Sequence, residues 1–340
     1  INPDKQGFTL GIRAVMDALP IEVQTGLPFA SRISGQMHAC GHDAHTAMLL
    51  GTAKALKERE KELSCRVLLL FQPSEEGIRS GAEEMVKGGV MDEIDVIIGL
   101  HVENWLPSGT IGVCKGSSMA SSRNFRLDFY GKTAHATLPH TGVDALACAI
   151  RAYDRFRDML CREIDPFAKY VFSIGKLSGG TTQNVVADHA YMLGTIRSFD
   201  MELDAFLIRR VEEIASSVAK DAGAMSELQT DLKAYVVYND PYLSDLVVSS
   251  ATKIVGADRI VEMPKKLSSE DFSQYLSKKP GVFFRLGTRN EQKGCVTLPH
   301  NNDFLIDEDA FVTGSNTCVQ FVLDHMGGVD NSLITRERKG

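Results

Sequence analysis

Several histidine, cysteine and acidic residues of this sequence are spaced so that their side chains could bind metal ions. The densest group is the stretch 38–45, which reads HACGHDAH and contains three histidines, one cysteine and one aspartate. Cys40 and His42 would supply a thiolate and an imidazole close together, a combination that suits a zinc-type or manganese-type centre. Taken alone, the stretch is also consistent with a buried cysteine beside a helix that Asp43 caps.

A second pair of candidate residues, Glu75 and Glu76, follows a short apolar run that ends at Phe71. Adjacent glutamates usually lie on a solvated surface. Here Pro73 favours a tight turn directly after a buried strand, and such a turn can direct both carboxylates into a site. One of them could then bind a metal ion while the other transfers protons, as metal-assisted hydrolysis requires.

Three more candidate residues follow other apolar runs. Asp17 comes after the run Phe8–Met16, and His101 comes directly after the run Asp95–Leu100. His300 lies in a polar loop beyond the apolar run Val282–Leu286. In isolation, His101 is equally consistent with a hydrogen-bonded histidine of the core, and the interpretation of His300 depends on the other candidates.

The elements that must position these side chains alternate between strands and helices in the first third of the chain. The expected strands are 8–16, 66–71 and 95–100, and the expected helices are 44–60 and 80–86. The second helix opens with Ser80 and Glu83, the spacing of a capping box. This alternation predicts a mostly parallel sheet with helices on both faces, and ligands of such sheets bind beyond the carboxyl ends of the strands. We therefore expect the candidate residues to meet at one edge of one sheet.

The middle third of the chain changes to a β-α-β-β-α-β order. The expected elements are a strand around Phe125–Phe129, a helix at 142–161, strands at 170–177 and 190–197, a helix at 202–222 and a strand at 228–237. That order is typical of a ferredoxin-like antiparallel sheet with two helices on one face. Beyond Pro241 the α/β character returns with a helix at 245–255, a strand at 282–286 and a helix at 310–325.

The sequence thus predicts two domains, which a chain of 340 residues can accommodate. The larger would be an α/β catalytic domain built from residues 1–118 and 238–330. The smaller, residues 119–237, would be inserted into it as a ferredoxin-like domain. Residues 331–340 are polar and basic and are expected to form a solvated tail.

The composition argues against several partners and locations. A net charge of -7 disfavours a nucleic-acid or anionic-membrane partner, because such partners require a concentrated basic surface. No apolar run approaches the roughly 20 residues that span a bilayer, and residues 1–14 lack the features of a signal peptide. The seven cysteines include no CxxC pair, which favours free thiols and a cytoplasmic location, and all but Cys40 are expected to be buried hydrophobic residues.

These motifs together resemble the N-acyl-amino-acid amidohydrolase group, which includes hippurate hydrolases, indole-acetyl-amino-acid hydrolases and N-acetyldiaminopimelate deacetylases. The group belongs to the aminoacylase and carboxypeptidase superfamily of dinuclear metallopeptidases. The stretches that carry the resemblance are MDALPI (16–21), MHACGHDAHTAMLLGTAKAL (37–56), FQPSEEG (71–77), GLHV (99–102), GKTAHATLPHTGVDA (131–145), NVVAD (184–188), GTIRS (194–198), SEDFSQY (269–275) and HNNDFLIDE (300–308).

The resemblance implies a role for each candidate residue. The implied ligands of two divalent metal ions are Cys40, His42, Glu76, His101 and His300. Glu75 would be the general base, and Asp17 would orient a ligand from behind the metal site. In the inserted domain, His135 would stabilise the oxyanion, and Asn184 and Arg197 would hold the substrate. The resemblance also implies that the inserted domain acts as a lid and forms a homodimer.

The predicted function is metal-dependent hydrolysis of the amide bond of an N-acyl amino acid, with zinc or manganese as the favoured metals and cobalt or nickel as alternatives. One alternative interpretation is a metal-dependent dipeptidase or carboxypeptidase. Another is a non-catalytic relative that binds ligands. Two departures from the family bear on activity. Val15 stands where the family usually has aspartate, and the family usually has several dozen residues before the first strand, so the catalytic domain is expected to be short at its N-terminus.

Overall fold

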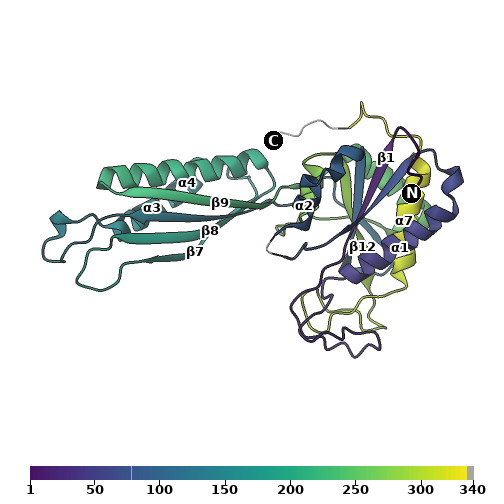
Figure 1. Cartoon of the computed structure of the whole chain (residues 1–340), viewed down its shortest axis with the longest axis horizontal. Coiled ribbons are helices and arrows are strands. Elements are labelled where there is room, and N and C mark those ends of the chain that lie inside the picture. The colour runs from purple at the N-terminus through teal and green to yellow at the C-terminus, as the bar shows by residue number, and fades with distance from the viewer. Residues whose placement is uncertain (78, 335–340) are drawn as a thin grey trace. The chain divides into compact units, whose positions relative to one another are not determined.

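The fold is taken from a computed structural model of the chain, which describes residues 1–77 and 79–334. The chain divides into two compact units (Figure 1). Unit 1 comprises Ile1–Ser118, Val237–Lys265 and the described residues from Glu270 onward. Unit 2 comprises Met119–Val236 and Lys266–Ser269. Of the tail predicted at 331–340, residues 335–340 lie outside the described residues.

Unit 1 contains a six-stranded sheet in the order β11-β4-β12-β3-β1-β2. Its strands are β1 Thr9–Val15, β2 Arg66–Gln72, β3 Val96–Pro107, β4 Ile111–Val113, β11 Ile260–Glu262 and β12 Gly281–Arg289. The run β2-β1-β3-β12 is parallel throughout, and only β4 pairs with β12 in antiparallel fashion. The largely parallel sheet that the alternating elements predict is therefore confirmed. Two short strands, β5 Gly116–Met119 and β10 Val237–Asn239, pair in a separate sheet.

Helices cover both faces of the large sheet. The helices α1 His42–Glu58, α5 Pro241–Val255 and α7 Ala310–His325 pack on the face that presents Ile12, Ile98 and Phe284. The opposite face carries the segment of the short helix α6, Ser273–Leu276, since a Cβ atom on Gly99 of β3 would lie 2.9 Å from the Phe272 ring. The helix α2, Gly81–Lys87, contacts α6 and β2. In the described part of the chain, no helix is long and apolar enough to cross a membrane.

The start of α1 differs from the prediction. Helix α1 begins at His42, and its N-cap is Gly41, whose φ of 78° lies in the left-handed region. The expectation that Asp43 caps the helix is wrong, since Asp43 lies within the first turn. Glycine is required at position 41 for two reasons: the backbone conformation, and a distance of only 2.5 Å from the position of a Cβ atom to Val102 Cγ2. In α2, by contrast, Ser80 Oγ accepts a hydrogen bond from Glu83 N at 3.1 Å, which confirms that Ser80 is the N-cap.

Unit 2 is a four-stranded antiparallel sheet in the order β7-β8-β6-β9. Its elements are β6 Ser122–Tyr130, α3 Ala145–Arg162, β7 Tyr170–Gly179, β8 His189–Ser198, α4 Met201–Ala222 and β9 Met225–Ala234. The side chains of Phe125, Leu127 and Phe129 alternate along β6 and pack in one core with residues of α3 and α4. The β-α-β-β-α-β order predicted for this part of the chain is confirmed.

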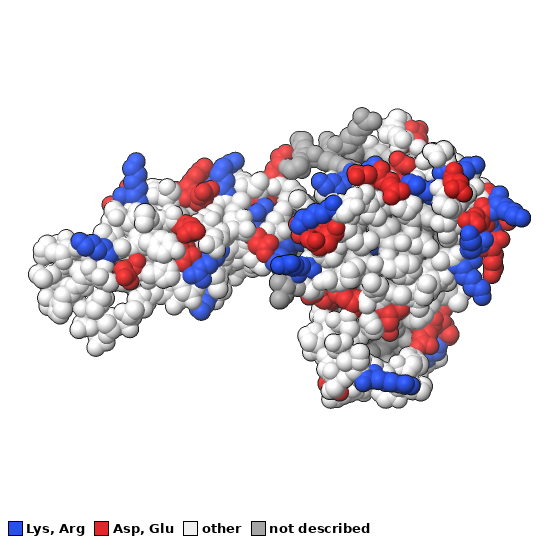
Figure 2. All heavy atoms as spheres, in the orientation of Figure 1, with Lys and Arg blue, Asp and Glu red and all other residues white. Residues whose placement is uncertain are grey.

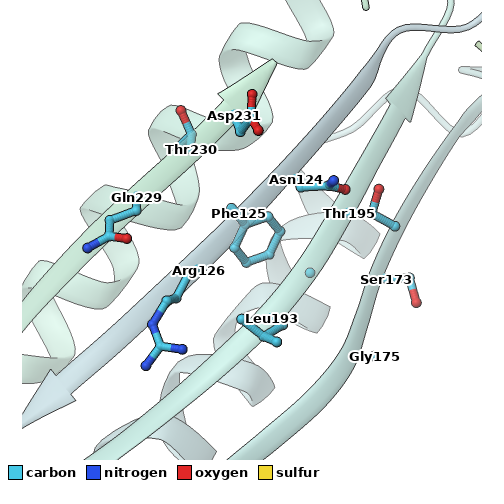
Figure 3. Close-up of a pocket in the computed structure, with 11 residues that line it drawn as sticks. Asn124, Phe125, Arg126, Ser173, Gly175, Leu193, Thr195, Gln229, Thr230 and Asp231 are labelled. Atoms are coloured by element: carbon cyan, nitrogen blue, oxygen red, sulfur yellow. The ribbon is translucent and has the colours of Figure 1, made fainter. Parts of the chain in front are cut away.

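The face of the unit 2 sheet away from the helices has a shallow pocket of about 610 Å³ (Figure 3). Gly194 lines it, and the ring of Phe125 packs directly against this glycine, since a Cβ atom there would lie 2.2 Å from Phe125 Cζ. Around it lie polar side chains such as Asn124, Arg126 and Asp231. None of the residues that line this pocket is a predicted catalytic, substrate-binding or metal-binding residue.

The seven cysteines are all free, and six of them are buried. Cys161 in α3 is exposed, so the expectation that it is a buried hydrophobic residue is wrong. It lies near the C-terminal end of an amphipathic helix, where the buried positions are Phe156 and Met159. Helical periodicity places residue 161 away from that face.

Candidate metal centre

Three candidate residues of unit 1 come shortly after the carboxyl ends of parallel strands. Asp17 follows β1, and Glu75 and Glu76 follow β2, as the sequence predicts. His101 does not follow a strand: β3 continues to Pro107, so the expectation that it ends at Leu100 is wrong. The strand continues because the residues after His101 pair with β12 in parallel register.

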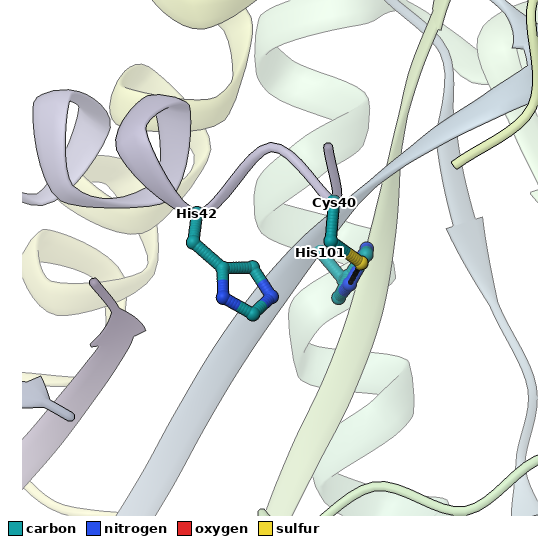
Figure 4. A group of neighbouring side chains, drawn as sticks. All are labelled: Cys40, His42 and His101. Atoms are coloured by element: carbon teal, nitrogen blue, oxygen red, sulfur yellow. Dashed lines mark hydrogen bonds between the residues drawn. The ribbon is translucent and has the colours of Figure 1, made fainter. Parts of the chain in front are cut away.

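The first group of side chains consists of Cys40, His42 and His101. One ligand atom from each residue lies within 4.8 Å of the others, and Cys40 Sγ is 3.5 Å from His101 Nε2. Cys40 lies in the loop before α1, His42 is the first residue of that helix, and His101 reaches them from β3 (Figure 4). A thiol and two imidazoles at these separations could bind one divalent cation.

Two further groups overlap with the first. Cys40 recurs in a group with Glu76 and His300, and His42 recurs in a group with Glu75 and Glu76. Within the former, His300 Nε2 is 2.9 Å from Glu76 Oε1. The backbone of His300 has a φ of 68°, and its N–H donates to the carbonyl of Ala39 at 2.7 Å. The loop that contains His300 is thereby fixed beside the cysteine loop, and all five predicted ligands lie in one set of overlapping groups.

Asp17 connects the histidine and glutamate parts of this set. Its Oδ1 lies 3.1 Å from His42 Nδ1, and its Oδ2 accepts a hydrogen bond from Glu76 N at 2.9 Å. Burial alone would raise the pKa of Asp17, but the hydrogen bonds from His42 and Glu76 lower it to about 2. An ionised Asp17 favours a proton on His42 Nδ1, which leaves the lone pair of Nε2 available to a metal ion.

The donor set fits a metal ion on two observations. The Nε2 atom of His42 is buried and has no hydrogen-bond partner among the described residues. Burial, and then the charges of Glu76 and Glu75, raise the pKa of the Cys40 thiol far above its ordinary value. A divalent cation among these residues would accept the imidazole lone pair and stabilise the thiolate and carboxylates together.

The other two histidines of the HACGHDAH stretch make contacts of a different kind. His38 Nδ1 lies 3.0 Å from the carbonyl oxygen of Asp17. His45 Nε2 accepts a hydrogen bond from Val102 N at 3.0 Å, and burial lowers the pKa of His45 well below its ordinary value. His45 is therefore a neutral side chain that joins α1 to β3.

Glu75 differs from Glu76 in its surroundings. A carboxylate oxygen of Glu75 lies within 4.8 Å of carboxylate oxygens of both Glu270 and Asp271. Burial, and then the charges of these two residues, raise the pKa of Glu75 well above its ordinary value. A carboxylate that binds a proton more readily than a free glutamate is suited to general-base catalysis near neutral pH.

The sequence alone predicts no role for the residues behind Glu75. Arg13 is fully buried and donates to Glu270 Oε1 at 2.7 Å and to Asp271 Oδ1 at 2.8 Å. Its Nε atom donates to Gln72 Oε1 at 2.8 Å. The signal that could have indicated this cluster is a charged residue inside an apolar strand, because such a residue requires a partner.

The predicted catalytic and substrate-binding residues of the inserted domain all lie in unit 2. The backbone N–H of Ala136, next to His135, donates to the carbonyl of Asn184 at 3.0 Å. The segments that contain His135 and Asn184 are therefore neighbours within unit 2. Arg197 lies on β8, where its Nη1 atom donates to Ser269 Oγ at 3.2 Å and burial lowers its pKa.

Comparisons with known proteins find relatives that match nearly the whole chain. The model of the peptidase family M20/M25/M40 matches residues 11–324, a range that contains every candidate residue. Thermostable carboxypeptidase 1 of Saccharolobus solfataricus is 38% identical over 317 residues, which cover 93% of this chain and 80% of that protein. N-acetyl-L-cysteine deacetylase of Bacillus subtilis is 36% identical over 316 residues, which cover 92% and 73% of the two chains.

A solved structure shows the same similarity in three dimensions. The YXEP protein of Bacillus subtilis, described as a dinuclear metal binding peptidase from the M20 family, has a TM-score of 0.81 to this chain at 32% sequence identity. The match covers 96% of this chain and 83% of that one.

Proposed function

Because this chain belongs to the peptidase family M20/M25/M40, we propose that it hydrolyses the amide bond of N-acyl amino acids to a free amino acid and a carboxylic acid. A relative with 36% identity is named for deacetylation of N-acetyl-L-cysteine, a reaction of this class. The observation that carries the proposal is the overlap of three ligand groups on Cys40, His42 and Glu76, with Glu75 in one of those groups. Metal-binding side chains thereby adjoin a carboxylate that can transfer protons.

The residues proposed to hold two divalent cations are Cys40, His42, Glu76, His101 and His300. The similar YXEP structure is described as dinuclear, which supports two metal ions rather than one. Divalent cations at this position would lower the pKa of a water molecule and polarise the acyl carbonyl. The thiolate favours zinc, while the imidazoles and carboxylate also suit manganese, with cobalt or nickel as alternatives.

The protein side chains have separate tasks in this proposal. Glu75 removes the proton from the attacking water and returns it to the departing amine. Asp17 fixes the tautomer and orientation of His42. In unit 2, His135 stabilises the oxyanion, while Asn184 and Arg197 bind the amino-acid part of the substrate, with the guanidinium suited to its carboxylate.

A second candidate function is carboxypeptidase activity. The observation that favours it is the relative with 38% identity that is named a thermostable carboxypeptidase. The two reactions share the cleavage of an amide bond beside a free carboxylate, so the same metal ligands and the same base would serve both. They differ in the group on the acyl side, which is a simple acid in one case and an amino acid or peptide in the other.

A substrate panel with metal control distinguishes these functions. We expect release of free amino acid from at least one of N-acetyl, N-benzoyl, N-succinyl and indole-acetyl amino acids, loss of that activity after chelation, and its recovery with zinc or manganese. Amino-acid release is measured by chromatography with the metal content of each sample. Faster cleavage of dipeptides or N-blocked peptides than of all acyl amino acids would replace the first proposal by the second. An inactive protein that binds no metal on reconstitution would indicate a non-catalytic relative.

We also propose that the protein is a homodimer formed through unit 2. The motifs of this unit resemble those of lid domains that dimerise, and its sheet ends in two edge strands, β7 and β9. Sedimentation equilibrium should give about twice the mass of the 37.3 kDa chain at micromolar concentration. A monomer mass across that range would rule the proposal out.

A further inference from the structure

We propose that Asp271 is a positioning residue that holds both Glu75 and Glu76 in place. These two glutamates lie on the glutamate turn, defined here as residues 73–77. Asp271 is far from the turn in sequence, and neither the resemblance nor the family match gives it a role. The inference rests on the proposed function, in which Glu75 is the base and Glu76 a metal ligand.

One buried carboxylate binds the chain on both sides of the glutamate turn. Before the turn, Gln72 Nε2 lies 2.9 Å from each of the two oxygens of Asp271. After the turn, Ser80 Oγ donates to Asp271 Oδ2 at 2.7 Å, and Ala82 N donates to the same oxygen at 3.3 Å. Asp271 therefore fixes the distance between the end of β2 and the start of α2.

Asp271 is itself held in a fixed place. Arg13 Nη2 donates to Asp271 Oδ1 at 2.8 Å, and the Asp271 side chain is only 6% exposed. The Arg13 guanidinium is held in turn by Glu270 and Gln72 and lies 5.6 Å from the centre of the Phe272 ring. Asp271 is thus held by a buried guanidinium on one side, and it holds the chain before and after the turn on the other.

The glutamate turn needs this support because its backbone is strained and closely packed. Ser74 has a φ of 55°, which non-glycine residues rarely adopt. Gly81 N donates to the carbonyl of Ser74 at 3.0 Å, and a Cβ atom on Gly81 would lie 1.7 Å from Pro73 O. Gly81 therefore packs against the start of the glutamate turn without space to adjust. A shift of Gly81 would move Glu75 and Glu76 as well.

Movement of the turn would displace the base and a metal ligand together. Glu75 and Glu76 form one ligand group with His42, with all three ligand atoms within 4.8 Å of one another. Displacement of a reacting group by about 1 Å can cost about 10²-fold in rate, and loss of support behind a metal ligand lowers metal affinity by about 10–100-fold. Loss of Asp271 should therefore lower kcat and metal affinity, with little change in KM.

The test compares Asp271→Asn with a matched carboxylate elsewhere. The amide would present an N–H group to donors that now share two acceptor oxygens. Asp324 is the matched control: it accepts hydrogen bonds from Ser250 Oγ at 2.7 Å, Lys253 Nζ at 2.6 Å and Gln320 Nε2 at 2.8 Å. It joins α5 to α7 and has no contact with the glutamate turn. Asp324→Asn thus removes a similar acceptor without acting on either glutamate.

For Asp271→Asn we expect kcat to fall by about 10²-fold with KM nearly unchanged, and the affinity for Zn²⁺ or Mn²⁺ titrated into the apoprotein to fall at least about tenfold. Asp324→Asn should keep the wild-type values of all three. Equal loss of kcat in the two variants, or wild-type kcat and metal affinity in Asp271→Asn, would overturn the inference.

A milder variant covers the case in which Asp271→Asn does not fold. Ser80→Ala removes one donor to Asp271 and the cap of α2, while Asp240→Ala removes the cap of α5. We expect Ser80→Ala alone to lower kcat and metal affinity, by several-fold. An inactive wild-type protein would count against the proposed function, whereas metal affinity still decides whether Asp271 positions Glu76.

Discussion

Replacement of Glu75 by glutamine is expected to lower kcat by about 10²–10⁴-fold while the protein keeps its metal ions. Glutamine has nearly the same shape as glutamate, so the packing against Glu270 and Asp271 is preserved. It has no basic oxygen, however, and cannot take the proton from water. The raised pKa of Glu75, which arises from burial and then from Glu270 and Asp271, is the property that glutamine removes. The measurement is kcat on the best substrate of the panel, together with metal content per chain.

Asp17→Asn is the comparison that separates proton transfer from metal binding. Asp17 contacts His42 and the backbone of Glu76, and it belongs to none of the ligand groups. Its loss should lower metal affinity by about 10–100-fold, and excess metal should restore much of the activity. Excess metal should restore nothing in Glu75→Gln. Full turnover by Glu75→Gln would show that another residue is the base.

Local patterns in the sequence predict the elements that position the candidate centre. The helix α7 has the bounds 310–325 that its apolar periodicity indicates, and β1 lies within the predicted run 8–16. These elements are long enough for the period of their apolar residues to appear. By contrast, β4 and β11 have three residues each and show no period, so they were not predicted.

The sequence also predicts which candidate residues meet, because the carboxyl ends of parallel strands lie at one edge. It predicts less about what surrounds them. The carboxylate partners of Arg13 lie 257 and 258 residues further along the chain, beyond the reach of any spacing argument. The start of α1 depends on contact between Gly41 and Val102, which also comes from a different strand. Tertiary contacts of this kind decide where a helix begins and how a buried charge is neutralised.

Arg13→Met is expected to destabilise the protein by about 3–5 kcal/mol, the usual effect of removing one partner from a buried ion pair. In the wild type, the charges of Glu270 and Asp271 outweigh burial and keep the pKa of Arg13 above its ordinary value. Methionine fills the space but leaves the two carboxylates, 4% and 6% exposed, without their cation. Urea unfolding monitored by circular dichroism gives the free energy of unfolding for both proteins.

The loss of unfolding free energy in Arg13→Met should become smaller as the pH falls, if unpaired carboxylates cause it. Burial already raises the pKa of Asp271 in the wild type, and without Arg13 the folded-state pKa of Asp271 should rise further. A carboxylate with a raised folded-state pKa destabilises the fold above its unfolded pKa, and that penalty shrinks as falling pH protonates the folded state. The difference between wild type and Arg13→Met should therefore narrow from pH 7 to pH 5. Arg59→Met, which removes an exposed pair with Glu62, should show no such trend. A pH-independent difference would instead attribute the loss to packing, because hydrophobic contacts do not titrate.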